Sequence, residues 1–137
     1  MPEANGGAPP GGAANRARTR FEHADPILRV ADMTRSLRYY TTVLGFTPAD
    51  WGTEDFTSVN RDGAGIYLCQ GDQGQPGTWV WVGVEDVAAL HEEYVEAGAL
   101  IRSAPVNYPW AYEMTVEDPD GHVLRFGSGP RTDIPLV

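Results

Sequence analysis

The sequence of 137 residues contains no lysine, a single cysteine and no long apolar run, and each absence excludes something. One cysteine, Cys69, can form neither an intrachain disulfide nor a cysteine-based zinc site. No stretch approaches the roughly 20 apolar residues that a membrane-spanning helix needs. The N-terminus also lacks the apolar segment of a signal peptide, so we expect a cytoplasmic protein with no membrane partner.

All ten basic residues are arginines, and the 19 acidic residues outnumber them to give a net charge of −9. The first twenty residues carry three Arg and one Glu, so the remaining 117 residues carry −11. Nucleic acid and anionic membranes repel a body of this charge, whereas a neutral or cationic ligand suits it better. We therefore expect no nucleic-acid partner.

The composition divides the chain into a tail, one domain and a second short tail. Residues 1–22 are rich in Gly, Pro and Ala and have little to bury, which predicts a disordered tail. The length of the remainder fits a single domain, which we place at residues 23–130. Residues 131–137 are predicted to form an irregular C-terminal tail.

The domain reads as the same pattern of elements twice: a strand, a helix and three further strands. The first module covers about residues 24–70 and the second about 78–128, with a Gly/Gln/Pro loop between them. Asp32 (or Thr34) and Asp86 are suitable helix N-caps, and Gly45 and Gly98 are suitable helix ends. This duplication predicts an α+β fold in which two tandem βαβββ modules form a curved mixed sheet with a concave surface. The later strands are expected near residues 46–51, 56–61, 65–70, 78–84, 100–106, 111–117 and 122–127.

Strand alternation assigns side chains to the two faces of the predicted sheet. If Val80 and Val82 face the core, then Trp79 and Trp81 face the concave side. By the same rule the following residues face that side too: Tyr67, Cys69 and Arg125.

Several segments resemble the vicinal-oxygen-chelate superfamily, which includes glyoxalase I, extradiol dioxygenases and bleomycin-resistance proteins. The segments are the paired βαβββ pattern, Leu28-Arg29-Val30-Ala31-Asp32 and Asp118-Pro119-Asp120-Gly121-His122. Trp79-Val80-Trp81-Val82, Pro109-Trp110 and Leu124-Arg125-Phe126-Gly127 are similar to the bleomycin-binding resistance proteins of that group. This likeness implies a homodimer that holds a drug in grooves between subunits without changing it. The chain departs from the family at Ala111-Tyr112, where Gly-Arg is often found.

The resemblance also indicates where superfamily enzymes hold a divalent metal, and here these positions are Asp25, Trp79 and Arg125. An indole offers no lone pair to a metal and a guanidinium stays cationic, so one carboxylate remains, which is too few. We therefore predict no metal, no other cofactor and no catalytic residue.

Two enzymatic alternatives stay open at this stage. One is a metal-dependent lyase, isomerase or dioxygenase with a displaced site built from His23, Asp25 and Glu113. The other is a metal-free enzyme that uses Arg125 or Tyr112 as an acid or an electrostatic stabiliser.

The favoured hypothesis is a self-resistance protein that sequesters an aromatic natural-product antibiotic of the bleomycin, mitomycin or enediyne type. Indole and phenol rings stack on planar ligands, and nearby carboxylates attract a cationic tail. The resemblance places Phe56, Trp110 and Tyr112 at the mouth of the groove. The predicted ligand-binding residues are Trp51, Asp55, Phe56, Tyr67, Cys69, Trp79, Trp81, Trp110, Tyr112, Glu113 and Arg125.

Overall fold

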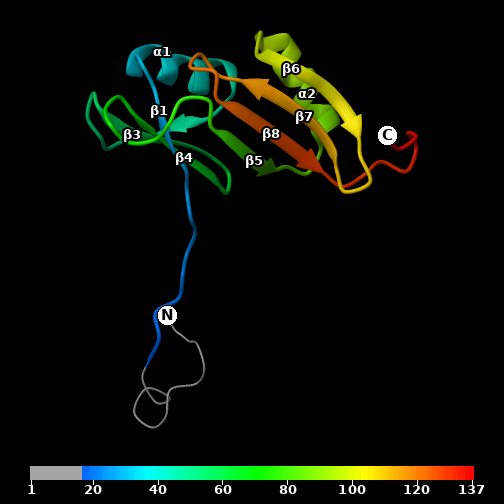
Figure 1. Cartoon of the computed structure of the whole chain (residues 1–137), viewed down its shortest axis with the longest axis horizontal. Coiled ribbons are helices and arrows are strands. Elements are labelled where there is room, and N and C mark those ends of the chain that lie inside the picture. The colour runs from blue at the N-terminus through cyan, green and yellow to red at the C-terminus, as the bar shows by residue number, and fades with distance from the viewer. Residues whose placement is uncertain (1–16) are drawn as a thin grey trace.

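The structure is a computed structural model of the chain, and it describes residues 17–137. Residues 1–16 of the predicted tail lie outside the described residues. Residues 17–22 form neither helix nor strand and lead into the domain as an extended segment (Figure 1).

The predicted α+β fold with two tandem modules is confirmed, and the strands form two four-stranded sheets with orders β1-β4-β3-β2 and β5-β8-β7-β6. In both sheets the first strand is parallel to its neighbour and the other pairs are antiparallel. The first module comprises β1 (Ile27–Arg29), α1 (Met33–Arg38), the π-helix η2 (Tyr39–Val43), β2 (Thr47–Pro48), β3 (Phe56–Arg61) and β4 (Ala64–Cys69). The second comprises β5 (Trp79–Gly83), α2 (Val87–Ala97), β6 (Leu100–Asn107), β7 (Tyr112–Glu117) and β8 (Val123–Ser128).

The helix boundaries follow from local side-chain chemistry. The Asp32 carboxylate accepts a hydrogen bond from the backbone N–H of Arg35, and Asp86 accepts one from the N–H of Ala89, so each caps its helix. The second helix ends at Gly98, whose φ of 81° is readily adopted only by glycine. None of the described helices is long and apolar enough to cross a membrane.

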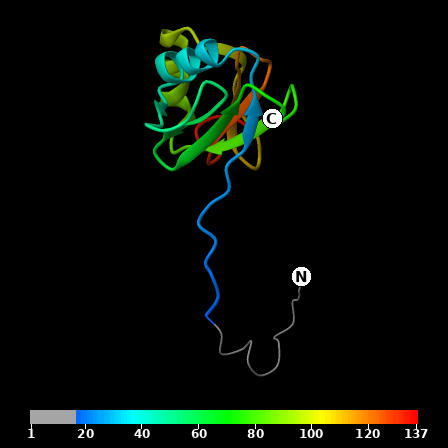
Figure 2. The same ribbon diagram turned by 90° about the vertical axis from the view of Figure 1, so that its left-hand side faces the viewer.

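The two modules share one hydrophobic core, which lies between the helices and the sheets. Figure 2 shows the two helices close together at one end of the folded part, opposite the N-terminal segment. The predicted inward-facing residues of the strands are confirmed: Ile66, Leu68, Leu124 and Phe126 are buried, and Val80 and Val82 pack against this core. We call the other side of each sheet, turned away from the helices, its open face.

A turn of the second module, residues 118–122, binds the first module. The Tyr40 hydroxyl donates to the Asp118 carboxylate at 2.8 Å, and the backbone N–H of Ala31 donates to Asp120 at 2.9 Å. Burial raises the pKa of the Asp118 carboxyl, although the hydrogen bonds donated to it act in the opposite direction. These contacts connect residues 78 and 89 positions apart and fix one module against the other.

The fully buried His122 side chain completes this connection. Its Nδ1 accepts a hydrogen bond from the backbone N–H of Thr78 at 3.0 Å, and its Nε2 lies 2.6 Å from the carbonyl oxygen of Arg29. Because a carbonyl only accepts, these contacts define a neutral ring with its proton on Nε2. His122 therefore joins the start of β5 to the end of β1.

Candidate functional site: an aromatic floor on the second sheet

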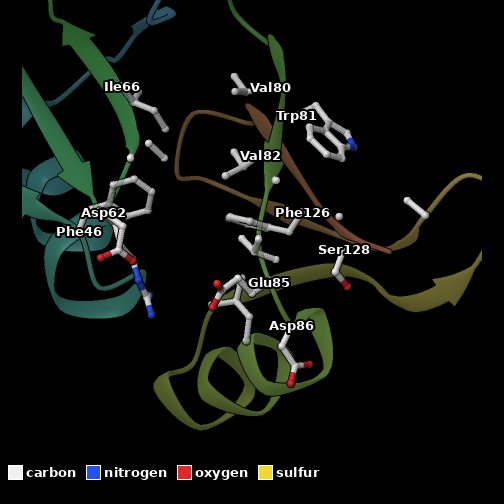
Figure 3. A pocket seen from close by; sticks show the side chains of 18 of the residues that line it. Phe46, Asp62, Ile66, Val80, Trp81, Val82, Glu85, Asp86, Phe126 and Ser128 are labelled. Carbon is white, nitrogen blue, oxygen red and sulfur yellow. The ribbon is translucent and has the colours of Figure 1, made fainter. Parts of the chain in front are cut away.

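Two tryptophans of β5 lie on the open face of the second sheet, as alternation predicts. Trp79 and Trp81 are each 55% exposed, whereas the intervening Val80 contacts the core. Figure 3 shows Trp81 on the opposite side of β5 from Val80 and Val82. Exposed indoles of this size on a sheet face mark a surface that contacts something else. We call this pair, Trp79 and Trp81, the aromatic floor.

Trp81 lies flat on the sheet because Gly83 and Gly127, which have no side chains, lie beneath its indole. A Cβ atom at Gly127 would lie 2.7 Å from Cζ2 of the indole, and one at Gly83 would lie 3.1 Å from Cζ3. Any side chain at Gly127 would displace the ring. The indole therefore presents its outer surface to solvent in a fixed orientation.

Glu113 of β7 holds this orientation. It is only 4% exposed, and its Oε2 accepts a hydrogen bond from Trp81 Nε1 at 2.8 Å. Its Oε1 accepts from Nε and Nη2 of Arg125, both at 2.8 Å. Burial raises the pKa of Glu113, but hydrogen bonds donated by Trp81, Arg125 and Trp110 outweigh it and hold the pKa below its ordinary value. Glu113 is thus a charged residue that positions Trp81 and Arg125.

Trp79 extends across the same face. The Arg102 guanidinium of β6, at the far edge of the sheet, lies 5.1 Å from the centroid of the Trp79 ring. This cation–π contact fixes the far end of the side chain. Val123, the register partner of Trp79 on β8, is 1% exposed, as expected beneath a flat indole.

A cleft of about 1240 Å³ lies between β4 and β5, and Trp81 lines it (Figure 3). Trp110 also belongs to its lining. Trp110, in the loop between β6 and β7, is 61% exposed and stacks on Tyr108 with ring centroids 4.7 Å apart. The cleft has both apolar and acidic walls. Its lining includes Phe46, Ile66, Val80, Val82, Asp62, Glu85 and Asp86.

The predicted aromatic residues of the first module form a separate group on the open face of the first sheet. Phe56 and Tyr67 stack with centroids 5.3 Å apart, and Trp51 lies 6.3 Å and 6.0 Å from them. Cys69 is the register partner of Phe56 and is buried, whereas the Asp55 side chain is exposed. None of these five residues lines the cleft beside Trp81. Within one chain, the predicted site residues therefore form two aromatic surfaces rather than one groove.

Tyr112 lies away from both surfaces, contrary to the expectation that it stands at the groove mouth. It precedes Glu113 on β7, so alternation directs it to the opposite face, where it packs partly buried against the core. The Arg131 guanidinium lies 5.5 Å from its ring centroid. Tyr112 and Glu113 are adjacent in the sequence but lie on opposite faces of β7.

The residues required for a displaced metal site do not come together in one chain. His23 Nδ1 lies 3.1 Å from Asp25, whereas both oxygens of Glu113 are occupied by Trp81 and Arg125. Within residues 17–137 no three His, Cys, Asp or Glu side chains are arranged to hold a metal ion. These residues do not fit the divalent metal of the superfamily enzymes.

Two functional candidates were missed by the sequence analysis, and both are polar atoms without a partner. Among the described residues, the buried side-chain atoms that lack a hydrogen bond are Thr115 Oγ1 and Arg29 Nε. Thr115 is the register partner of Arg125 on the open face of the second sheet, and Arg29 lies beside Cys69 on that of the first. Alternation along β7 from Glu113 places Thr115 on the open face, and alternation along β1 from the buried Leu28 places Arg29 there. Buried polar atoms without a hydrogen bond are rare, and both Thr115 Oγ1 and Arg29 Nε belong to side chains on the open faces of the sheets.

The sequence from residue 20 to residue 126 matches the family described as Glyoxalase/Bleomycin resistance protein/Dioxygenase superfamily. The chain belongs to this superfamily. No curated protein sequence is similar enough to count as a match.

Solved structures, two of them of drug-binding proteins, resemble the fold. The bleomycin-binding protein from bleomycin-producing Streptomyces verticillus, complexed with copper(II)-bleomycin, is 26% identical with a TM-score of 0.69, covering 82% of this chain and 99% of that one. TnmS3, an antibiotic-binding protein from Streptomyces sp. CB03234, is 24% identical with a TM-score of 0.69, covering 83% and 100%. A glyoxalase/bleomycin resistance protein/dioxygenase from Nocardioides is 19% identical with a TM-score of 0.65, covering 89% and 92%.

Proposed function

We propose that this protein binds a planar aromatic natural-product antibiotic and sequesters it without chemical change. The observation that carries the proposal is the aromatic floor: two indoles, each 55% exposed, on the open face of the second sheet. The ligand belongs to the bleomycin, mitomycin or enediyne type, and the protein acts as a cytoplasmic homodimer that confers resistance by lowering the free drug concentration.

The energetics favour a flat ligand. Each well-placed aromatic pair contributes about 1 kcal/mol beyond the burial of area, and covering a half-exposed indole adds the hydrophobic term. Trp81 is already held by Glu113 and lies on Gly127, so little side-chain freedom is lost when a ligand stacks on it. The acidic lining of the neighbouring cleft favours ligands that also carry a cationic tail.

Two further observations support antibiotic binding. The superfamily includes bleomycin-resistance proteins, and the Streptomyces verticillus protein of similar fold carries copper(II)-bleomycin in its structure. Within residues 17–137 no three His, Cys, Asp or Glu side chains are placed to hold a metal ion, so the described donor set does not favour the metal-dependent alternative. In a homodimer, the partner subunit would close a groove whose floor is Trp79 and Trp81.

The test is a tryptophan-fluorescence titration of the protein with copper(II)-bleomycin, a mitomycin and an enediyne. We expect one of them to bind with a micromolar or lower Kd at about one site per chain. Trp81→Ala should weaken that binding by about 2 kcal/mol, roughly 30-fold, as is usual for a central aromatic contact. Val95→Ala, on the exposed side of α2, serves as the matched control and should leave the Kd unchanged. Absence of binding by all three compounds, or equal affinity in Trp81→Ala, contradicts the proposal.

A further inference from the structure

Arg29 lies on the open face of the first sheet and has no counter-ion among the residues that the structure describes. It follows the fully buried Leu28 in β1, so its side chain is directed away from the core. Its Nε is buried without a hydrogen-bond partner. Among residues 17–137 it makes no ion pair, whereas Arg35, Arg61 and Arg125 each do. An unmet buried donor destabilises the protein, so this arrangement favours a ligand that satisfies it.

The nearby carboxylate does not satisfy Arg29. A small cavity of about 420 Å³ is lined by Arg29, Gln70 and Asp120, among others. Asp120 already accepts hydrogen bonds from Arg35, Ser36 and the backbone N–H of Ala31. Its charge is therefore compensated within the first module, and the charge of Arg29 is not.

Arg29 lies in line with the aromatic residues of the same face. Its register partner is Cys69 on β4, and the partner of Cys69 is Phe56 on β3. Neighbouring strands are about 4.8 Å apart, so the backbones of Arg29 and Phe56 are separated by about 10 Å. Phe56 in turn stacks on Tyr67. A small aromatic acid has the length to contact the rings at one end and the guanidinium at the other.

We propose that the open face of the first sheet is a second ligand site, specific for an aromatic carboxylate. The ring of the ligand stacks on Phe56 and Tyr67, and its carboxylate accepts hydrogen bonds from the Arg29 guanidinium. The planar guanidinium matches a carboxylate with two parallel hydrogen bonds. This site is separate from the aromatic floor and requires a ligand of the opposite charge to the one that the acidic cleft favours.

The test compares 2-naphthoate with 2-naphthamide by calorimetric titration at pH 7 and low salt, since the two probes share a ring and differ in charge. In the wild-type protein naphthoate should bind at least tenfold more tightly, because a charge-assisted pair is about twice as strong as a neutral hydrogen bond. Arg29→Gln should reduce the affinity for naphthoate to that for naphthamide. Arg38→Gln removes the same charge from the exposed side of α1 and should leave the preference intact.

Two further variants test the proposal if Arg29→Gln does not fold, and show where naphthoate binds. Arg29→Lys keeps the charge but loses the paired donors, so an intermediate preference is expected, and this variant decides the matter if Arg29→Gln does not fold. Trp51→Phe should remove most of the fluorescence change caused by naphthoate, since Trp51 lies beside Phe56. Equal binding of the two probes, a preference that survives Arg29→Gln, or no binding of either probe overturns the proposal. Antibiotic binding that depends on Trp81 would still stand in each of those cases, so the two proposals fail separately.

Discussion

Replacing Glu113 with Gln tests whether a buried carboxylate holds the aromatic floor in place. In the wild-type protein its two oxygens accept hydrogen bonds from Trp81 and Arg125, all at 2.8 Å. Glutamine has nearly the same size but only one acceptor oxygen. Its NH₂ group must face either the indole N–H or the guanidinium, both of which are donors, so one of them loses its partner.

The destabilisation expected from Glu113→Gln follows from the burial of the carboxylate. A hydrogen bond to a charged group contributes about 1.5–3 kcal/mol, and losing one partner of a buried pair reaches the upper end of that range. The Arg125 side chain is 38% exposed, so water compensates part of the loss. We expect Glu113→Gln to lower the free energy of unfolding by about 2 kcal/mol at pH 7, and the melting temperature by roughly 8 °C for a domain of this size. Urea unfolding monitored by circular dichroism measures the change in the free energy of unfolding.

The pH dependence of the stability difference distinguishes a charged Glu113 that accepts hydrogen bonds from a side chain that only fills space. The pKa of Glu113 lies below its ordinary value of 4.5, so its charged form is favoured in the folded state. The resulting stabilisation is complete above pH 4.5 and is lost as the pH falls through the lower folded-state pKa. The difference between wild type and Glu113→Gln should therefore shrink between pH 5 and pH 3. Glu96→Gln, at an exposed position of α2, provides the reference. A difference below about 0.5 kcal/mol at pH 7, or one that is constant with pH, refutes the reasoning.

Three more substitutions test other parts of the structure. Gly127→Ala should displace the Trp81 indole, because the new Cβ would lie 2.7 Å from the ring. We expect a changed near-UV circular dichroism spectrum and an antibiotic affinity at least tenfold lower, whereas an unchanged spectrum would contradict this packing. Tyr40→Phe leaves an oxygen of the buried Asp118 carboxylate without its donor and should destabilise the protein by about 1–3 kcal/mol in urea, so a neutral result would mean that this bond does not join the modules. Gly98→Ala places a side chain at a φ of 81° and should destabilise by about 1 kcal/mol in the same assay; equal stability would contradict the left-handed cap.

The elements of the fold were predictable because their signals are local. Asp32 and Asp86 are immediate neighbours of the helices they cap, and Gly98 ends the second helix with its own backbone. Strand alternation identified the exposed tryptophans of β5 from five consecutive residues. The π-helix over Tyr39–Val43 was not predicted, because nothing in its sequence distinguishes it from a continuation of the preceding helix.

The candidate site was predicted only in part because its geometry depends on contacts between distant residues. The hydrogen bond from Trp81 to Glu113 spans 32 positions, and the space beneath the indole depends on Gly127 of another strand. The family resemblance placed Tyr112 at the groove mouth, but the register of β7 directs its side chain to the core. That Arg29 Nε has no partner among residues 17–137 depends on the positions of distant residues and is visible only in the folded structure.

The central claim is that the chain binds an aromatic antibiotic intact, and native mass spectrometry of the purified protein with that antibiotic tests it most directly. The account predicts a dimer that carries two ligand molecules of unaltered mass, and little bound ligand in a variant with both Trp79 and Trp81 replaced by Ala. A protein that remains unliganded at micromolar drug, or a released ligand of changed mass, would contradict it.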